Sequence, residues 1–189
     1  MQGRGFLIRC ADDVVMGCEV EADARKILAV LAKRFARFGL RMHPTKTALM
    51  AVRNPAAPPG AATGNGTGDL LGLTHSWTQS RRGVWVIKRR TARKRLCRTK
   101  QSLGRWCRTH RHAPFKDQYQ RLCQKLRGPF QYVGLRGNMR RREEGRRYAA
   151  KAWQYWLSRR SSQSPIGWEK CQKLLQTYVF PTPRIVHNI

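Results

Sequence analysis

Two adjacent carboxylates, Asp12 and Asp13, stand at the junction of two apolar runs in a chain that has only 10 acidic residues. Each run has the length of a β-strand and is enriched in Val, Ile and Phe, so we expect the pair at the tip of a β-hairpin. Two divalent ions about 4 Å apart need such fixed carboxylates to clamp the oxygens of a phosphoryl transfer. Asp12 and Asp13 are therefore candidate metal ligands, and the alternative is that Asp-Asp is ordinary turn chemistry.

The charge balance indicates a polyanionic partner. The 39 Lys and Arg against 10 Asp and Glu give a formal net charge of +29 over 189 residues. Most of these cations lie within residues 81–160, where the only acids are Asp117, Glu143 and Glu144. Lys and Arg release condensed counterions when they neutralise phosphates, and interleaved tryptophans offer stacking faces to bases. This part of the chain is predicted to bind nucleic acid, the alternative being a merely solvated basic face.

Two dense basic runs supply the candidate nucleic-acid contacts. We expect the first run to make the leading phosphate contacts, because it clusters where a predicted strand passes into a predicted helix. The second run is the alternative footprint. The candidate residues are Arg89, Arg90, Arg93, Lys94, Arg98, Arg105, Arg140, Arg141, Arg142, Arg146 and Arg147.

Hydrophobic periodicity predicts the elements that position the carboxylate pair. Over residues 21–38 the apolar side chains recur at helical spacing, with acids in the first turn and Gly39 as the expected C-cap. Residues 40–43 are predicted to be extended, and Pro44 is expected to turn the chain. Residues 46–52 are predicted to form a further strand. The first fifty residues are thus hairpin, helix and strand.

A second hairpin is predicted further along the chain. Residues 54–68 are rich in Pro, Gly, Ala and Thr, which is typical of a flexible loop. Residues 70–74 and 83–87 are apolar and bracket a polar turn at residues 80–82. This pattern favours two antiparallel strands.

Beyond residue 90 the period becomes helical and predicts four helices. Pro114 and Gly128 are expected to open and to close the second of them. We assign most aromatic residues to packing, so that Lys and Arg on the opposite faces can meet RNA or DNA. The apolar faces consist of Leu96, Leu103 and Trp106; of Phe115, Tyr119, Leu122, Cys123 and Leu126; of Tyr148, Ala149, Ala152, Trp153, Trp156 and Leu157; and of Trp168, Cys171, Leu174, Leu175 and Tyr178.

Composition and cysteine content indicate where in the cell the protein is expected. With 41% hydrophobic residues the chain can build a core, and no run approaches the roughly 20 apolar residues of a membrane span. We therefore expect a cytoplasmic protein with no membrane partner, and free thiols in place of disulfides. A zinc site made by Cys97, Cys107, His110 and His112 is a weak alternative, because their spacing matches no common finger.

In the order of its motifs, the chain resembles the second half of the palm of group II intron reverse transcriptases. The resemblance rests on Cys10-Ala11-Asp12-Asp13, on the Gly-Leu-Arg-Met-His-Pro-Thr-Lys-Thr run at 39–47, and on the Leu-Gly-Leu-Thr-His run at 71–75. Later segments are similar to the thumb and maturase region of that family. These segments are 89–106, 126–128, 132–134, Asn138, 156–160 and 181–187.

The resemblance implies an α+β fold in two domains. Residues 1–90 would be the C-terminal half of the palm, made of a β-hairpin, a helix, a strand and a second hairpin. Residues 91–189 would be an all-helical thumb and maturase domain that binds RNA.

The resemblance also implies an activity, RNA-directed DNA polymerisation, and roles for three residues. Asp12 would coordinate catalytic Mg²⁺, Asp13 would support the same site, and Lys46 would donate a proton to the pyrophosphate leaving group. Intron RNA and an RNA/DNA primer-template would be the partners. Cys10 departs from the family, which usually has a Tyr at this position.

A larger departure concerns the rest of the active site. In this family another metal-binding Asp, the fingers and the template grip lie upstream of the hairpin, and here only nine residues precede Cys10. Two adjacent carboxylates cannot complete a two-metal site, so we expect the isolated chain to be inactive and to need a separate N-terminal palm and fingers polypeptide. The hairpin is also expected to expose an unpaired edge. The alternative function is a non-catalytic maturase module that assists intron folding and splicing.

Overall fold

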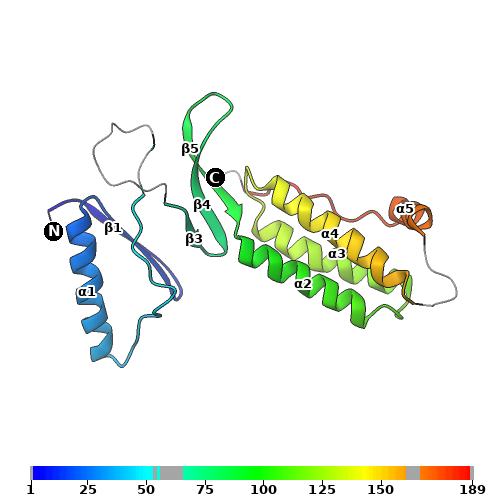
Figure 1. Ribbon diagram of the computed structural model, residues 1–189, viewed down its shortest axis with the longest axis horizontal. Coiled ribbons are helices and arrows are strands. Elements are labelled where there is room, and N and C mark those ends of the chain that lie inside the picture. Colours follow the sequence, from blue (N-terminus) through cyan, green and yellow to red (C-terminus); the bar gives the residue numbers. More distant parts are fainter. Residues whose placement is uncertain (1, 53–54, 56–65, 161–166, 188–189) are drawn as a thin grey trace. The chain divides into compact units, whose positions relative to one another are not determined.

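The computed structural model shows a mixed α+β protein (Figure 1). Within its described part, two small antiparallel sheets and five helices are present. The general α+β class predicted from the sequence is thereby confirmed. The described residues are 2–52, 55, 66–160 and 167–187.

The chain divides into two compact units. The first unit consists of Met1–Leu71 with Ser76–Ile87, and the second consists of Gly72–His75 with Lys88–Ile189. Residues 72–75 belong with the helical part because the carbonyl of Gly72 accepts a hydrogen bond from the N–H of Ala92 at 3.0 Å.

The first unit begins with the predicted hairpin and helix. Strand β1 (Gly5–Cys10) pairs antiparallel with β2 (Asp13–Cys18), in a register that sets Cys10 opposite Asp13. Helix α1 (Glu21–Arg37) follows after an extended Val20. Acids in its first turn and arginines in its last turn complement the helix dipole.

Large apolar side chains of the first unit remain accessible to solvent. Within the described residues β1 and β2 pair only with each other. Phe6, Leu7 and Ile8 of β1 are 58–61% exposed, and Phe38 after α1 is 72% exposed. The described hydrophobic core lies entirely in the second unit.

The strand predicted over residues 46–52 is wrong. Residues 44–46 form a turn, and in the described part of this segment only Val52 makes an isolated bridge. A strand exists only when its N–H and C=O groups pair with a neighbour, and this segment joins neither sheet. The strand propensity of these residues was not sufficient to form a strand without a pairing partner.

The second sheet has three strands in the order β3-β4-β5. They are β3 (Gly68–Leu70), β4 (Leu73–Gln79) and β5 (Trp85–Thr91). Leu71 and Gly72 both have positive φ, at 52° and 75°, as a two-residue type I′ turn requires. A hairpin is present in β4 and β5, but its first strand is 73–79 and not the predicted 70–74, which contains the turn at Leu71 and Gly72. The flexible loop predicted over 54–68 lies mostly outside the described residues.

Four helices follow, as predicted. They are α2 (Arg93–Thr109), α3 (Phe115–Tyr132), α4 (Met139–Leu157) and α5 (Trp168–Thr177). Each pair among α2, α3 and α4 is in contact (Figure 1). Within the described residues, none of the helices is long and apolar enough to cross a membrane.

Helix α3 does not end at Gly128 as predicted. It runs on through Pro129 to Tyr132. The expected cap fails because Gly128 is not among the glycines with positive φ, and because Phe130 lies one turn beyond Leu126 on the buried face. Burial of an aromatic ring outweighs the one backbone hydrogen bond that a proline removes.

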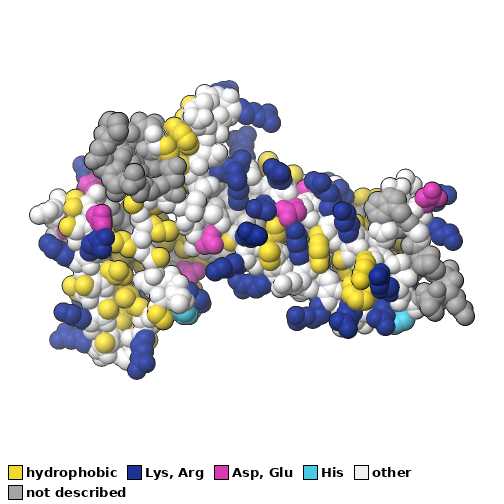
Figure 2. Space-filling view, in the orientation of Figure 1, with side chains coloured by type: hydrophobic (Ala, Val, Ile, Leu, Met, Phe, Trp, Pro, Cys, Tyr) yellow, Lys and Arg dark blue, Asp and Glu magenta, His cyan; other side chains and the backbone are white. Residues whose placement is uncertain are grey.

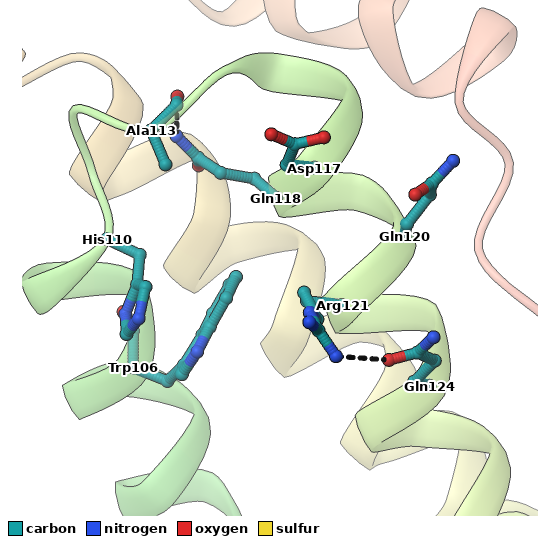
Figure 3. Close-up of a pocket in the computed structure, with 8 residues that line it drawn as sticks. All are labelled: Trp106, His110, Ala113, Asp117, Gln118, Gln120, Arg121 and Gln124. Carbon is teal, nitrogen blue, oxygen red and sulfur yellow. Dashed lines mark hydrogen bonds between the residues drawn. The ribbon is translucent and has the colours of Figure 1, made fainter.

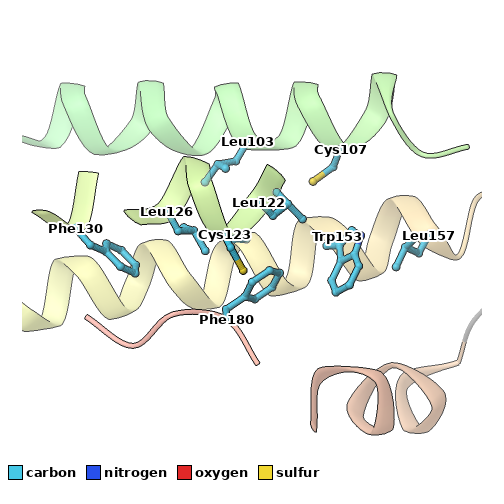
Figure 4. Packing of buried hydrophobic residues seen from close by; sticks show 10 residues of the cluster. Leu103, Cys107, Leu122, Cys123, Leu126, Phe130, Trp153, Leu157 and Phe180 are labelled. Atoms are coloured by element: carbon cyan, nitrogen blue, oxygen red, sulfur yellow. The ribbon is translucent and has the colours of Figure 1, made fainter. Parts of the chain in front are cut away.

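The buried hydrophobic residues of the described helices form one cluster (Figure 4). Trp153 of α4 is its largest fully buried side chain, with 1% exposure, and its indole N–H donates to Oε1 of Gln118 at 2.8 Å. The buried members are Leu103, Cys107, Leu122, Cys123, Leu126, Phe130, Ala149, Trp153, Leu157 and Phe180.

The segment after α5 runs along the helices as an extended strap, residues 179–187. Phe180 inserts into the core, and the hydroxyl of Tyr119 donates to the carbonyl of Val179 at 2.9 Å. The N–H of Val186 donates to the carbonyl of Gly134 at 2.8 Å. A Cβ on Gly134 would lie 2.8 Å from the Val186 side chain, so this close approach requires glycine.

Candidate functional site

The carboxylate pair lies at the tip of the β1–β2 hairpin, where the sequence places it. Ala11 and Asp12 form the two-residue turn, and Asp13 opens β2. Ala11 has a φ of 51°, while Asp12 is not among the residues with positive φ, which matches a type II′ hairpin turn. Both carboxylates are exposed. The hairpin thus presents two oxygen donors to solvent from a defined turn.

These donors fit a part of a Mg²⁺ site but not a whole one. Carboxylate oxygens are the ligands that Mg²⁺ prefers, and adjacent carboxylates on a rigid turn can share an ion. A two-metal site needs further protein oxygens from a neighbouring strand. Across the described ranges, no three His, Cys, Asp or Glu side chains gather where they could hold a metal.

Lys46, the predicted proton donor, lies on the turn that follows His43. Its backbone N–H donates to the carbonyl of His43 at 3.3 Å, and its side chain is exposed. In the described part of the chain, no ion pair joins Lys46 to Asp12 or Asp13. The role assigned to Lys46 therefore stays a prediction.

The alternative zinc site receives no support from the position of its residues. Cys107 belongs to the hydrophobic core, and burial raises the pKa of its thiol to about 12. Zinc binds the thiolate, so this thiol is a poor ligand. His110 is instead stacked on Trp106, with ring centroids 4.6 Å apart.

Helix α2 carries a row of exposed cations, which we call the α2 stripe: Lys94, Arg98 and Arg105. Their spacing of 4 and 7 residues places them on one helix face over about 16 Å, at a rise of about 1.5 Å per residue. Among the described residues none of the three forms an ion pair with an acid. The stripe therefore offers its full charge to phosphates. Figure 2 shows many Lys and Arg side chains on the surface of the helical unit.

The neighbouring candidates of the first basic run surround the start of α2. Arg93 is its first residue and is exposed. Arg90 of β5 is also exposed, whereas Arg89 is half-buried. They extend the basic surface from the end of β5 into the helix.

The second basic run on α4 is largely paired with acids. Arg146 donates to Glu143 at 2.8 Å, and this carboxylate raises the pKa of the guanidinium. Arg141 lies 3.1 Å from Glu144, which also accepts from Lys100 of α2 at 2.6 Å. Arg147 lies 3.8 Å from Glu143, and Arg140 is exposed. These pairs lower the charge that α4 offers to a polyanion.

Arg142 must be removed from the predicted nucleic-acid contacts. Its side chain is 3% exposed, and it donates to the carbonyls of Phe130, at 2.6 Å, and of Arg184. Burial lowers the pKa of the guanidinium, which these carbonyl dipoles stabilise. Arg142 thus caps the carbonyl end of α3 and ties the strap to the helices. A run of arginines in the sequence did not reveal that one of them points inward.

Substitution of Arg142 by Met is expected to destabilise the helical unit by about 3 kcal/mol, because two buried carbonyls lose a charged donor. The exposed neighbour provides a matched control, since Arg140→Met removes the same charge and is expected to stay within about 0.5 kcal/mol. Urea unfolding followed by circular dichroism measures both changes. Equal stability of the two variants would contradict the capping role.

A pocket between α2 and α3 was not predicted from the sequence (Figure 3). It holds the half-buried Trp106 opposite polar side chains of α3. The sequence pattern predicts packing roles for most aromatic residues, and Trp106 has in addition a side that faces this pocket. The available signal was the helical spacing of Asp117, Arg121 and Gln124, which sets three polar side chains on one face of α3.

Comparison with protein-family models, with curated proteins and with solved structures finds no match to this chain. The site is therefore interpreted from its own geometry. This geometry contains a carboxylate pair at a hairpin tip and a basic surface on a well-packed helical unit.

Proposed function

We propose that the chain is an RNA-binding protein, the C-terminal portion of a group II intron reverse transcriptase/maturase. The observation that carries the RNA-binding part is the α2 stripe, three exposed cations in a row without acidic partners. Such a row can follow the phosphates of one strand, and the counterions that it releases drive binding. The motif order of the sequence supports the family assignment.

We further propose that Asp12 and Asp13 contribute to a polymerase site that another polypeptide completes. Bound Mg²⁺ would supply the charge that stabilises the attacking and leaving oxygens of nucleotidyl transfer. The part of this chain is to hold two carboxylates on a tight turn. The open edges and exposed apolar side chains of the β1–β2 hairpin are suited to pack against further strands of a palm.

The alternative is a maturase module without chemistry of its own. It is favoured by the lack of a third metal-ligating side chain near the hairpin tip within the described residues. It is also favoured by the placement of the whole described core in the helical unit. In this alternative Asp12 and Asp13 are turn residues.

The RNA-binding proposal is tested by removing the charge of the α2 stripe. The variant Lys94→Gln, Arg98→Gln, Arg105→Gln is expected to bind RNA more weakly and to lower the slope of log affinity against log salt by about 2, at roughly 0.7 for each single-strand phosphate contact. Filter binding or fluorescence anisotropy with a single-stranded RNA measures both the affinity and the salt slope. The salt concentration is varied from about 50 to about 300 mM, a range in which such slopes are measured.

A second triple variant provides the matched control. Arg141→Gln, Arg146→Gln, Arg147→Gln removes the same three charges from α4, where they are paired with Glu143 and Glu144. We expect it to change the salt slope less than the α2 variant does. An unchanged slope for the α2 variant would move the footprint away from this helix, and no RNA binding by the unmodified chain would refute the function.

A further inference from the structure

We propose that the pocket between α2 and α3 receives an unpaired nucleobase of the bound RNA. This inference rests on the proposed RNA-binding function and adds a base-recognition site to it. The pocket has a volume of about 500 Å³, which lies within the range of small-ligand sites. The side chains that matter are Trp106, His110, Asp117, Gln120, Arg121 and Gln124.

The first wall of the pocket is an aromatic pair on α2. The rings of Trp106 and His110 stack with an interplanar angle of 17°. Nδ1 of His110 lies 2.8 Å from the hydroxyl of Thr109 and 3.0 Å from the carbonyl of Trp106, so the imidazole is held in place. Figure 3 shows the indole between His110 and the side chains of α3. One indole face is thus covered by His110, and the Lys125 ammonium lies over the ring, 5.6 Å from its centroid, so a base that stacks on the second face displaces this flexible side chain.

The opposite wall consists of exposed polar side chains of α3. Nη1 of Arg121 donates to Oε1 of Gln124 at 3.3 Å (Figure 3). A planar guanidinium can stack on the second face of a base, and amide and carboxylate groups can pair with its hydrogen-bonding edge. Gln120, Gln124 and Asp117 supply these groups. The pocket therefore combines stacking with edge recognition.

The floor of the pocket is rigid. Nε2 of Gln118 donates to the carbonyls of Arg111, at 3.1 Å, and of Ala113, at 2.7 Å. Oε1 of Gln118 accepts from the indole of Trp153. With 1% exposure, Gln118 holds the α2–α3 connection against the core and fixes the spacing of the two walls.

The charges favour a base over a phosphate as the occupant. In the described part of the chain, Arg121 is the only Lys or Arg that lines the pocket, and Asp117 repels an anion. The phosphates beside the base can be bound at the rim of the pocket, by Arg105 directly before Trp106 and by Lys125, once its ammonium leaves its place over the Trp106 ring. An RNA strand that follows the α2 stripe would reach the pocket at its end.

The test uses the full chain and a single-stranded RNA with 2-aminopurine at one unpaired position. We expect the unmodified chain to quench this fluorophore, and Trp106→Leu to remove the quenching and to weaken binding by at least about fivefold, the lower end of base–aromatic stacking. The affinity for a blunt RNA duplex and the salt slope should not change, because stacking releases no counterions.

Two further variants keep the test decisive. Trp156→Leu removes another half-buried tryptophan that packs on the core outside the pocket, and it should retain the quenching. Gln124→Ala changes an exposed side chain and should weaken quenching without loss of helical content. An unmodified chain that binds no RNA refutes the proposed function. If RNA binding is salt-dependent but neither Trp106→Leu nor Gln124→Ala changes the quenching, the base pocket alone is refuted. The pocket is also refuted if Trp106→Leu lowers the affinities for duplex and for single-stranded RNA equally.

Discussion

Replacement of Trp153 by Ala is expected to destabilise the helical unit by about 4 kcal/mol, within the range for buried large aromatics. The indole contacts three elements: its ring centroid lies 6.0 Å from that of Phe115, 6.4 Å from that of Tyr178 and 5.5 Å from that of Phe180. The substitution opens a cavity among all of them. It also leaves Oε1 of Gln118 without its buried donor.

Unfolding in urea, followed by the helical circular dichroism signal, measures this change. Trp153→Phe separates the two causes, because it retains most of the ring volume and loses only the hydrogen bond, at about 1–2 kcal/mol. Trp156→Ala is the control, since this indole is only partly buried. A loss below about 1 kcal/mol for Trp153→Ala would show that the core can repack around the site.

The double variant Asp12→Ala, Asp13→Ala is expected to abolish polymerisation by a reconstituted reverse transcriptase. The assay combines this chain with a polypeptide that carries the N-terminal palm and fingers, and it follows Mg²⁺-dependent nucleotide incorporation on an RNA template. Loss of two metal ligands should lower the rate by more than about a hundredfold. Mutation of a residue that only hydrogen-bonds a metal ligand already lowers metal affinity or activity by about 10- to 100-fold. RNA affinity should stay within about twofold, because the α2 stripe lies in the other unit.

Controls separate metal binding from hairpin structure. Asp12→Asn, Asp13→Asn retains the turn-forming side chains but removes both charges, and it should be as inactive as the alanine variant. Glu169→Gln removes an exposed acid on α5 and should be neutral. Full activity of the asparagine variant would reduce the pair to turn residues and favour the maturase alternative. A parallel loss of RNA binding would show that the two units do not act separately.

Local chemistry explains how far the sequence alone could lead. The hairpin around Asp12, helix α1 and the four later helices followed from apolar periodicity and turn residues, which act over a few positions. The burial of Trp153 and Leu157 followed in the same way, because one face of α4 is apolar. The excess of cations, and with it the expectation of a polyanionic partner, followed from the composition alone.

The tertiary structure decided which segments pair as strands and which side chains point into the core. Residues 46–52 have strand composition, but among the described residues they join neither sheet and only Val52 makes an isolated bridge, whereas a strand needs hydrogen bonds to a neighbour. Arg142 lies within a run of arginines, yet it is buried because the carbonyls of Phe130 and Arg184 converge on its guanidinium. Both facts depend on residues that are distant in the sequence, so neither segment reveals them by its own composition.

The amino-acid types and their order show where an acidic and a basic site can form: two carboxylates on one turn, and cations along the helices. Which of these cations are free to bind phosphates depends on the folded arrangement. It paired Arg146 with Glu143, left the α2 stripe without acids in the described part of the chain, and set Trp106 opposite the polar face of α3. The physical reason is that charge and shape are properties of neighbours in space, and packing assigns those neighbours.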